Sequence, residues 1–96
     1  MSGLNEPIRD TPQPVSVAPD QVDLAHVTRP NKTLAVRVRV AVDDGSERTE
    51  SGFALGWTKT HVLVQVQWPA EYYKGAREFW VEAERVRRRV IEPGRF

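Results

Sequence analysis

The sequence predicts a mainly β domain of five short strands, preceded by a flexible N-terminal tail. Residues 33–42 and 62–68 place alternate side chains on two faces, which is the period of a β-strand. The turn sequence DDGS at 43–46 follows the first of these stretches and predicts a hairpin. A third indication is the run FWV at 79–81, because aromatic and β-branched residues are favoured in strands.

Length and composition limit what the chain can be. Its 96 residues make at most one domain, and the absence of cysteine excludes disulfide bonds. No apolar run approaches the ~20 residues that a membrane span requires, and no signal-peptide core is visible near the N-terminus. We therefore expect a cytoplasmic protein without a membrane partner. The excess of arginine over lysine suggests a bacterial source.

Residues 1–30 differ in composition from the rest of the chain. They contain five of the seven prolines and few large apolar side chains, so they bury too little surface to offset the entropy of ordering. We predict a flexible, proline-rich tail here, a β domain over 31–92 and a C-terminal tail over 93–96. Alternatively, the apolar side chains within 22–27 dock this segment onto the domain.

The predicted hairpin has one strongly and one weakly patterned strand. In 33–42, the leucine and the valines share one face, and the arginines share the other. In the return strand, 47–58, one face carries Phe53 and Trp57, which we expect in the core. The opposite face carries small residues at 52, 54 and 56, which indicate a bend or a close approach of another backbone.

The C-terminal third of the chain has two interpretations. As a helix over 69–91, apolar residues recur at 4-3-4-3-4 spacing, and the fold becomes a three-stranded antiparallel sheet plus one C-terminal helix. As strands, 77–81 and 87–91 flank a single 3₁₀-like turn at 82–86. We favour the strands, because Gly75 in the middle of the helix costs it about 1 kcal/mol relative to alanine.

The order of these elements resembles the end of an SH3-like small β-barrel of the Tudor and chromo type. In that superfamily, a strand ending in Trp-Val leads through one tight turn, with an apolar plug, into a short last strand. Here the matching positions are 80–81, the turn 82–85, the plug Val86 and the strand 87–91. The resemblance spans about residues 33–91. It implies a five-stranded SH3-like barrel and no activity.

Aromatic residues divide into expected core and expected surface. Large aromatics dominate small cores, so four are assigned to the interior. These four are Phe53, Trp57, Trp68 and Phe79. Tyr72, Tyr73 and Trp80 are predicted to form an exposed aromatic patch, since alternation turns Trp80 away from its inward neighbours. Such a patch suits base stacking or a protein partner. In Tudor-like barrels, aromatics also cage methylated lysine or arginine.

Arginines gather on two of the predicted strands. Arg37 and Arg39 share the solvent face of the first strand. Arg87 and Arg89 share one face of the last strand, with Arg88 on the other. The first and last strands of a small barrel are commonly neighbours, which predicts a basic stripe suited to a phosphate backbone. Alternatively, these charges only guard edge strands against aggregation.

No catalytic or metal-binding pattern is present. A nucleophilic triad needs serine or cysteine beside histidine and a carboxylate, but His26 falls in the tail and His61 in a turn. Two isolated histidines do not match a zinc site, and no phosphate-binding glycine loop occurs. We therefore expect no enzymatic activity, no metal and no cofactor.

These patterns predict a small accessory module that binds DNA or RNA. The net charge of +1 does not indicate this alone, but residues 74–96 hold seven basic and four acidic side chains. The predicted nucleic-acid site comprises Arg37, Arg39, Lys74, Arg77, Arg87, Arg88 and Arg89. The alternative is a protein interaction adaptor, or a structural subunit of a larger assembly or homo-oligomer, which would use the aromatic patch and the N-terminal tail.

Overall fold

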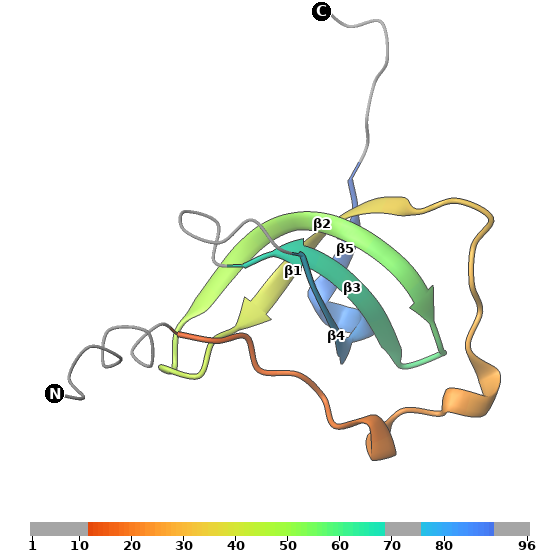
Figure 1. The fold of residues 1–96 in the computed structure, drawn as a ribbon, viewed down its shortest axis with the longest axis horizontal. Helices are drawn as coiled ribbons and strands as arrows, with labels where there is room; N and C mark the ends of the chain where they lie inside the picture. The colour runs from red at the N-terminus through yellow and green to blue at the C-terminus, as the bar shows by residue number, and fades with distance from the viewer. Residues whose placement is uncertain (1–11, 69–75, 90–96) are drawn as a thin grey trace, which may run out of the picture.

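The computed structural model describes residues 12–68 and 76–89 and shows a mainly β fold (Figure 1). Five antiparallel strands form one sheet in the order β4-β3-β2-β1-β5. The strands are β1 Leu34–Ala41, β2 Glu47–Trp57, β3 His61–Gln67, β4 Ala76–Glu82 and β5 Val86–Arg88. The described part of the chain also forms short 3₁₀ turns: η2 Pro19–Gln21, η3 Leu24–His26 and η4 Ala83–Arg85.

The predicted mainly β class is confirmed, and the helical alternative over 69–91 is wrong. β4 is extended from Ala76 onward and pairs with β3 along its whole length. The aromatic and β-branched run at 79–81 therefore outweighs the helical spacing. The sheet is not closed into a barrel. β4 and β5 are its edge strands, and no hydrogen-bonded ladder joins them within the described residues.

The hairpin between β1 and β2 turns through residues 43–46, as predicted. Gly45 has a φ of 92°, a conformation in which a side chain would be strained. The Asp44 carboxylate accepts hydrogen bonds from the Ser46 hydroxyl at 2.6 Å and from the Ser46 N–H at 2.9 Å. These two donors, the hydroxyl first, hold the pKa of Asp44 below its ordinary value.

β2 is the strand around which the sheet bends, visible as the long curved ribbon in Figure 1. Its first part pairs with β1 and its last part with β3. A Cβ atom at Gly52 would lie 2.3 Å from the Gln65 carbonyl oxygen, so only glycine lets the two backbones approach this closely. At Gly56 the close neighbour is the N-terminal segment, whose Val27 side chain lies 3.1 Å from the same position. The predicted close approach is confirmed at both glycines.

Valine side chains from β1 and β3 form most of the core. Val38, Val40 and Val64 are fully buried on the faces that alternation predicts. Trp68 and Phe79, two of the four aromatics assigned to the core, are also buried. The sequence pattern of these strands therefore identifies their inner faces correctly.

The prediction for the faces of β2 is wrong at Phe53 and is confirmed in part at Trp57. Gly52, Ala54 and Gly56 are buried, whereas Phe53 is 40% exposed on the opposite face. Trp57, at the end of the strand, is half-buried and packs against the core. The reason is the bend: the inner side of β2 has room only for small side chains, because other backbones approach it there.

A single 3₁₀ turn, η4, joins β4 to β5, as predicted. The Ala83 N–H donates to the Thr60 carbonyl between β2 and β3 at 2.9 Å, which holds the turn against the sheet. Val86, the predicted plug, follows with a half-buried side chain packed on the core. β5 begins at Val86 rather than at 87, and residues 90 and 91 of the predicted strand lie outside the described residues.

The N-terminal segment, residues 12–30, lies along the sheet rather than apart from it. The Val15 N–H donates at 2.8 Å to the carbonyl of the last β1 residue, and the Val17 N–H donates at 2.9 Å to the Trp80 carbonyl in β4. Further along, Thr28 forms a bridge with the last residue of β2. The segment therefore contacts both β1 and β4 across the open side of the sheet (Figure 1).

The docking alternative for this segment is realised in part. Val22 is buried, but Leu24 is 55% exposed. The Trp68 indole N–H also donates to the Pro12 carbonyl at 2.9 Å, which ties the start of the described segment to the core. Flexibility of the tail stays a prediction, and residues 1–11 lie outside the described residues.

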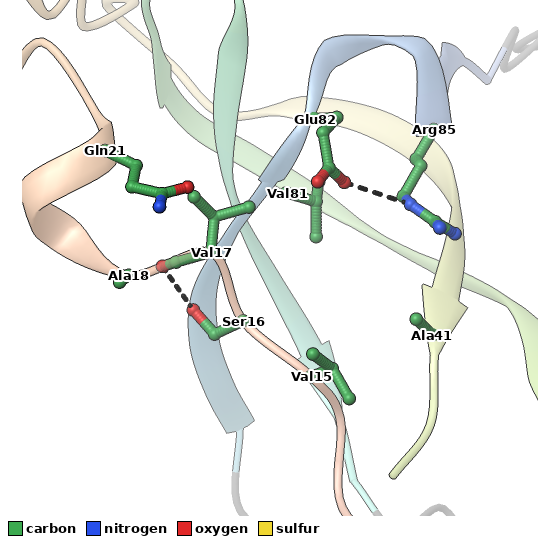
Figure 2. Close-up of a pocket in the computed structure, with 9 residues that line it drawn as sticks. All are labelled: Val15, Ser16, Val17, Ala18, Gln21, Ala41, Val81, Glu82 and Arg85. Carbon is green, nitrogen blue, oxygen red and sulfur yellow. Dashed lines mark hydrogen bonds and ion pairs between the residues drawn. The ribbon is translucent and has the colours of Figure 1, made fainter. Parts of the chain in front are cut away.

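A pocket of about 260 Å³ lies between the N-terminal segment, the end of β1, β4 and η4 (Figure 2). Val15 and Val17 of the segment line it together with Val81 of β4. At its rim, Arg85 and Glu82 form an ion pair of 3.0 Å. The segment thus leaves a small gap over the open side of the sheet instead of sealing it.

Candidate nucleic-acid interface

β5 pairs with β1, which confirms the predicted proximity of the first and last strands. In this register, Arg37 lies directly opposite Arg87. Both residues are exposed, and within the described residues neither has an ion-pair partner. Like charges that face each other across two strands destabilise the pair. The two guanidinium groups therefore form a positive site whose repulsion a bound anion would relieve.

Arg89 and Phe53 extend this site along the same face of the sheet, beside the next outward-facing position of β1. The Arg89 N–H donates to the Ala35 carbonyl at 2.9 Å, and Ala35 is paired in turn with Phe53 of β2. Because Ala35 is small, the Arg89 side chain reaches across it. Its guanidinium lies 6.0 Å from the centre of the Phe53 ring, and Nη2 lies 3.5 Å from the Gly52 carbonyl oxygen. Its Nε atom is buried without a hydrogen-bond partner among the described residues.

We call Arg37, Arg87, Arg89 and Phe53 the arginine face. It combines three guanidinium groups with one exposed aromatic ring on the outer side of β5, β1 and β2. Guanidinium groups bind phosphate oxygens, and a partly exposed aromatic ring provides a surface on which an unpaired base can stack.

Arg39 lies beside the arginine face but is largely neutralised. Its guanidinium is 3.9 Å from the Glu47 carboxylate and donates to the Glu84 carbonyl at 3.3 Å. Glu47 also binds Arg85 at 2.8 Å. Hydrogen bonding to Glu47 raises the pKa of Arg85. We therefore place Arg39 at the margin of the site.

Three other predicted site residues do not join the arginine face. Arg88 is paired with Val36, so it lies on the opposite face of β5, as alternation predicts. Arg77 is on β4, at the other edge of the sheet, where its Nη1 donates to the Gln13 side chain at 2.7 Å. Lys74 lies outside the described residues.

The predicted aromatic patch is wrong for Trp80. Trp80 does lie on the face opposite Phe79, but it is only 9% exposed. The N-terminal segment runs against β4 at this residue, and local alternation contains no information about that contact. Tyr72 and Tyr73 lie outside the described residues.

Comparisons with protein-family models, curated proteins and solved structures found no match. The arginine face is therefore identified by its geometry and charge alone.

Sequence reasoning missed Phe53 as a site residue and Arg48 as a structural one. Inward small residues on both sides of Phe53 are the signal that would have turned it outward. Arg48 stacks on the buried Trp68 with 4.6 Å between its guanidinium carbon and the ring centre, and it pairs with Glu50 at 3.3 Å. This arginine covers the core and does not contribute to the positive surface.

Other kinds of site find little support in the described residues. No group of three or more His, Cys, Asp or Glu side chains is placed to hold a metal ion between residues 12 and 68 or 76 and 89. His26 pairs with Asp23 at 2.8 Å on an exposed turn, and His61 contacts Thr60 at 2.8 Å. In the same described ranges, no helix is long and apolar enough to cross a membrane.

Proposed function

We propose that the protein is a small, non-enzymatic module that binds single-stranded nucleic acid through the arginine face. The observation that carries this proposal is the pairing of Arg37 with Arg87, two exposed cations that lie opposite each other and form no ion pair with a carboxylate of the described residues. A phosphate placed between them removes their repulsion and releases counterions from the nucleic acid.

Phe53 favours single-stranded over double-stranded nucleic acid. Its ring is exposed beside the arginines, and bases can stack on it only when they are unpaired. A duplex presents its phosphates but not the faces of its bases. Duplex binding would therefore use the arginines alone and be weaker.

The order of the strands in the sheet supports this proposal. The strand order β4-β3-β2-β1-β5, with a 3₁₀ turn between β4 and β5, supports our interpretation of the domain as an SH3-like barrel. In this interpretation, residues 13–17 bridge the open side between β1 and β4. We place the protein in the cytoplasm, where nucleic acid is accessible.

The test is fluorescence anisotropy of a labelled single-stranded oligonucleotide over a series of salt concentrations. Three phosphate contacts predict a slope of about −2 for log K against log [salt], since each contact on a single strand contributes about −0.7. The double variant Arg37→Gln/Arg87→Gln should reduce this slope to about −0.7 and weaken binding at low salt.

The matched control removes the same charge elsewhere. Lys59 and Arg77 are exposed and lie outside the arginine face, so Lys59→Gln/Arg77→Gln should leave the slope near that of the wild type. Equal losses in the two double variants would show that only net charge matters. Binding that does not respond to salt, or no binding to either DNA or RNA, would contradict the proposal and leave a protein partner as the better explanation.

Phe53→Ala separates stacking from charge. Loss of one base–aromatic stack weakens single-strand affinity by about 1–3 kcal/mol, or roughly 5- to 150-fold. The salt slope and the duplex affinity should not change, because every arginine is retained. An equal loss for single strand and duplex would instead indicate that Phe53 only orders Arg89.

A further inference from the structure

A second surface depression lies on the face of β5 opposite the arginine face. It has a volume of about 210 Å³ and opens at the edge of the core between β1, β2, β3 and η4. Half-buried apolar side chains line its walls, namely Leu34, Trp57, Ala83 and Val86. The charged group at this depression is Arg88. We call it the core mouth.

The charge of the core mouth excludes a cationic ligand. A cage for methylated lysine or arginine needs several aromatic walls or a carboxylate. Here Trp57 is the aromatic residue among the lining side chains, and Arg88 is positive. The ligand that fits is apolar at one end and negatively charged at the other.

The size of the core mouth indicates a side chain rather than a free small molecule. Pockets for small-molecule ligands have volumes of about 300–1,000 Å³. The 210 Å³ available here suits one large aliphatic or aromatic side chain from a partner. Such an anchor in an apolar pocket is the usual centre of a peptide interface.

Arg88 supplies the second point of recognition. It is exposed and has no ion-pair partner in the described parts of the chain. We infer that the core mouth binds a peptide in which a large apolar residue is flanked by aspartate or glutamate. The apolar side chain enters the depression, and a carboxylate pairs with the Arg88 guanidinium.

The two proposed surfaces are separate because successive side chains of β5 point to opposite faces of the sheet. Arg87 and Arg89 lie on the outer side, while Arg88 is paired with Val36 and lies on the inner side. Failure of either binding proposal therefore leaves the other intact. Single substitutions along β5 can distinguish the two.

The test uses three acetylated and amidated hexapeptides, titrated into the ¹⁵N-labelled full chain and followed by NMR. The first has the sequence Asp-Glu-Leu-Phe-Glu-Asp. The second replaces its acids by Asn and Gln, and the third replaces Leu-Phe by Ala-Ala. The first should shift the signals of Val36, Trp57 and Val86, and both controls should bind at least fivefold more weakly.

Two variants locate the contact on the protein. Arg88→Gln should weaken binding of the acidic peptide at least fivefold. Arg87→Gln, one residue away on the other face, should leave this affinity unchanged. Ala83→Leu fills the depression and should also weaken binding with Arg88 unchanged. The amide signals of each variant report its folding in the same experiment.

Several results would overturn the inference. They are absence of binding by the acidic peptide, equal binding by its amide control, and full affinity of Arg88→Gln. Shifts confined to the arginine face would also exclude the core mouth. Decanoate that shifts the core-mouth signals when the peptides do not would assign the depression to a fatty acid instead.

Discussion

β1 and β2 are hydrogen-bonded neighbours, yet they fill the core in opposite ways. β1 turns valines inward and charged residues outward. β2 turns Gly52, Ala54 and Gly56 inward and leaves Phe53 partly exposed. β1 runs beside the core, whereas β2 bends around it and is approached by two other backbones. Backbone distance, and not the hydrophobicity of the side chains, therefore decides which face of β2 is buried.

The largest loss of stability should come from adding one methyl group to the inner face of β2. Gly52→Ala would place its Cβ atom 2.3 Å from the Gln65 carbonyl oxygen, an overlap that only backbone movement can relieve. We expect a loss of about 3 kcal/mol or more in the free energy of unfolding, measured by urea denaturation.

Gly56→Ala is the matched comparison, because its Cβ atom would lie 3.1 Å from a Val27 methyl group and 3.2 Å from the Thr28 carbonyl oxygen, much less close than the 2.3 Å contact at Gly52. Shifts of a few tenths of an ångström relieve contacts of 3.1–3.2 Å, so Gly56→Ala should destabilise less than Gly52→Ala. Equal effects would mean that the bend of β2 does not depend on the β2–β3 approach.

On β1, the free energy of unfolding should fall when side-chain volume is removed from the core rather than added to it. Val38 is fully buried, and Val38→Ala deletes two methyl groups from the core. Transfer and cavity effects together predict a loss of about 2 kcal/mol, which lowers the melting temperature by about 10 °C in a domain of this size. Arg37→Ala, the adjacent outward position, serves as the control and should change stability little.

Phe53→Ala tests the outer face of β2. It removes a much larger side chain than Val38→Ala, but from a position that is 40% exposed. We expect a loss of about 1 kcal/mol or less, smaller than that of Val38→Ala. A loss above 2 kcal/mol would show that Phe53 belongs to the core and that the contrast between the strands is wrong.

The smallest expected effect lies in the turn that joins the two strands. The pKa of Asp44 is lowered in the folded state, so its carboxylate stabilises the fold above the ordinary pKa of 3.8, and this contribution is lost as the pH falls through the folded-state pKa. Wild type should therefore be slightly more stable than Asp44→Asn near neutral pH. The difference should vanish in acid, as urea denaturation over a pH series can measure; a constant difference would exclude the carboxylate as its cause.

The local sequence pattern was sufficient to predict most of the strands and turns of the sheet. Alternation located β1 and β3 and their inner faces, and the DDGS sequence located a turn that needs a positive φ at Gly45. These features depend on neighbours within a few residues, which is the range that periodicity reports. The same holds for the η4 turn and for the opposite orientations of Arg87 and Arg88.

Contacts between distant segments account for what the sequence did not predict. Trp80 lies on the expected face, but Val17 and its neighbours run against β4 at that point. Phe53 was assigned inward because no local rule shows that the β3 backbone would fill the space beside Gly52. The proximity of Arg37 and Arg87 follows from the resemblance to a small barrel, in which the first and last strands are neighbours, and not from any local pattern.

The position of β1 between β2 and β5 has a kinetic consequence. Its pairing with β2 closes a short turn, which can form within microseconds. Its pairing with β5 joins Val38 to Val86, 48 positions later in the sequence, and must wait for a slower search. During refolding, the hairpin amides should gain protection from hydrogen exchange first, and the arginine pair should assemble only in the final, rate-limiting step.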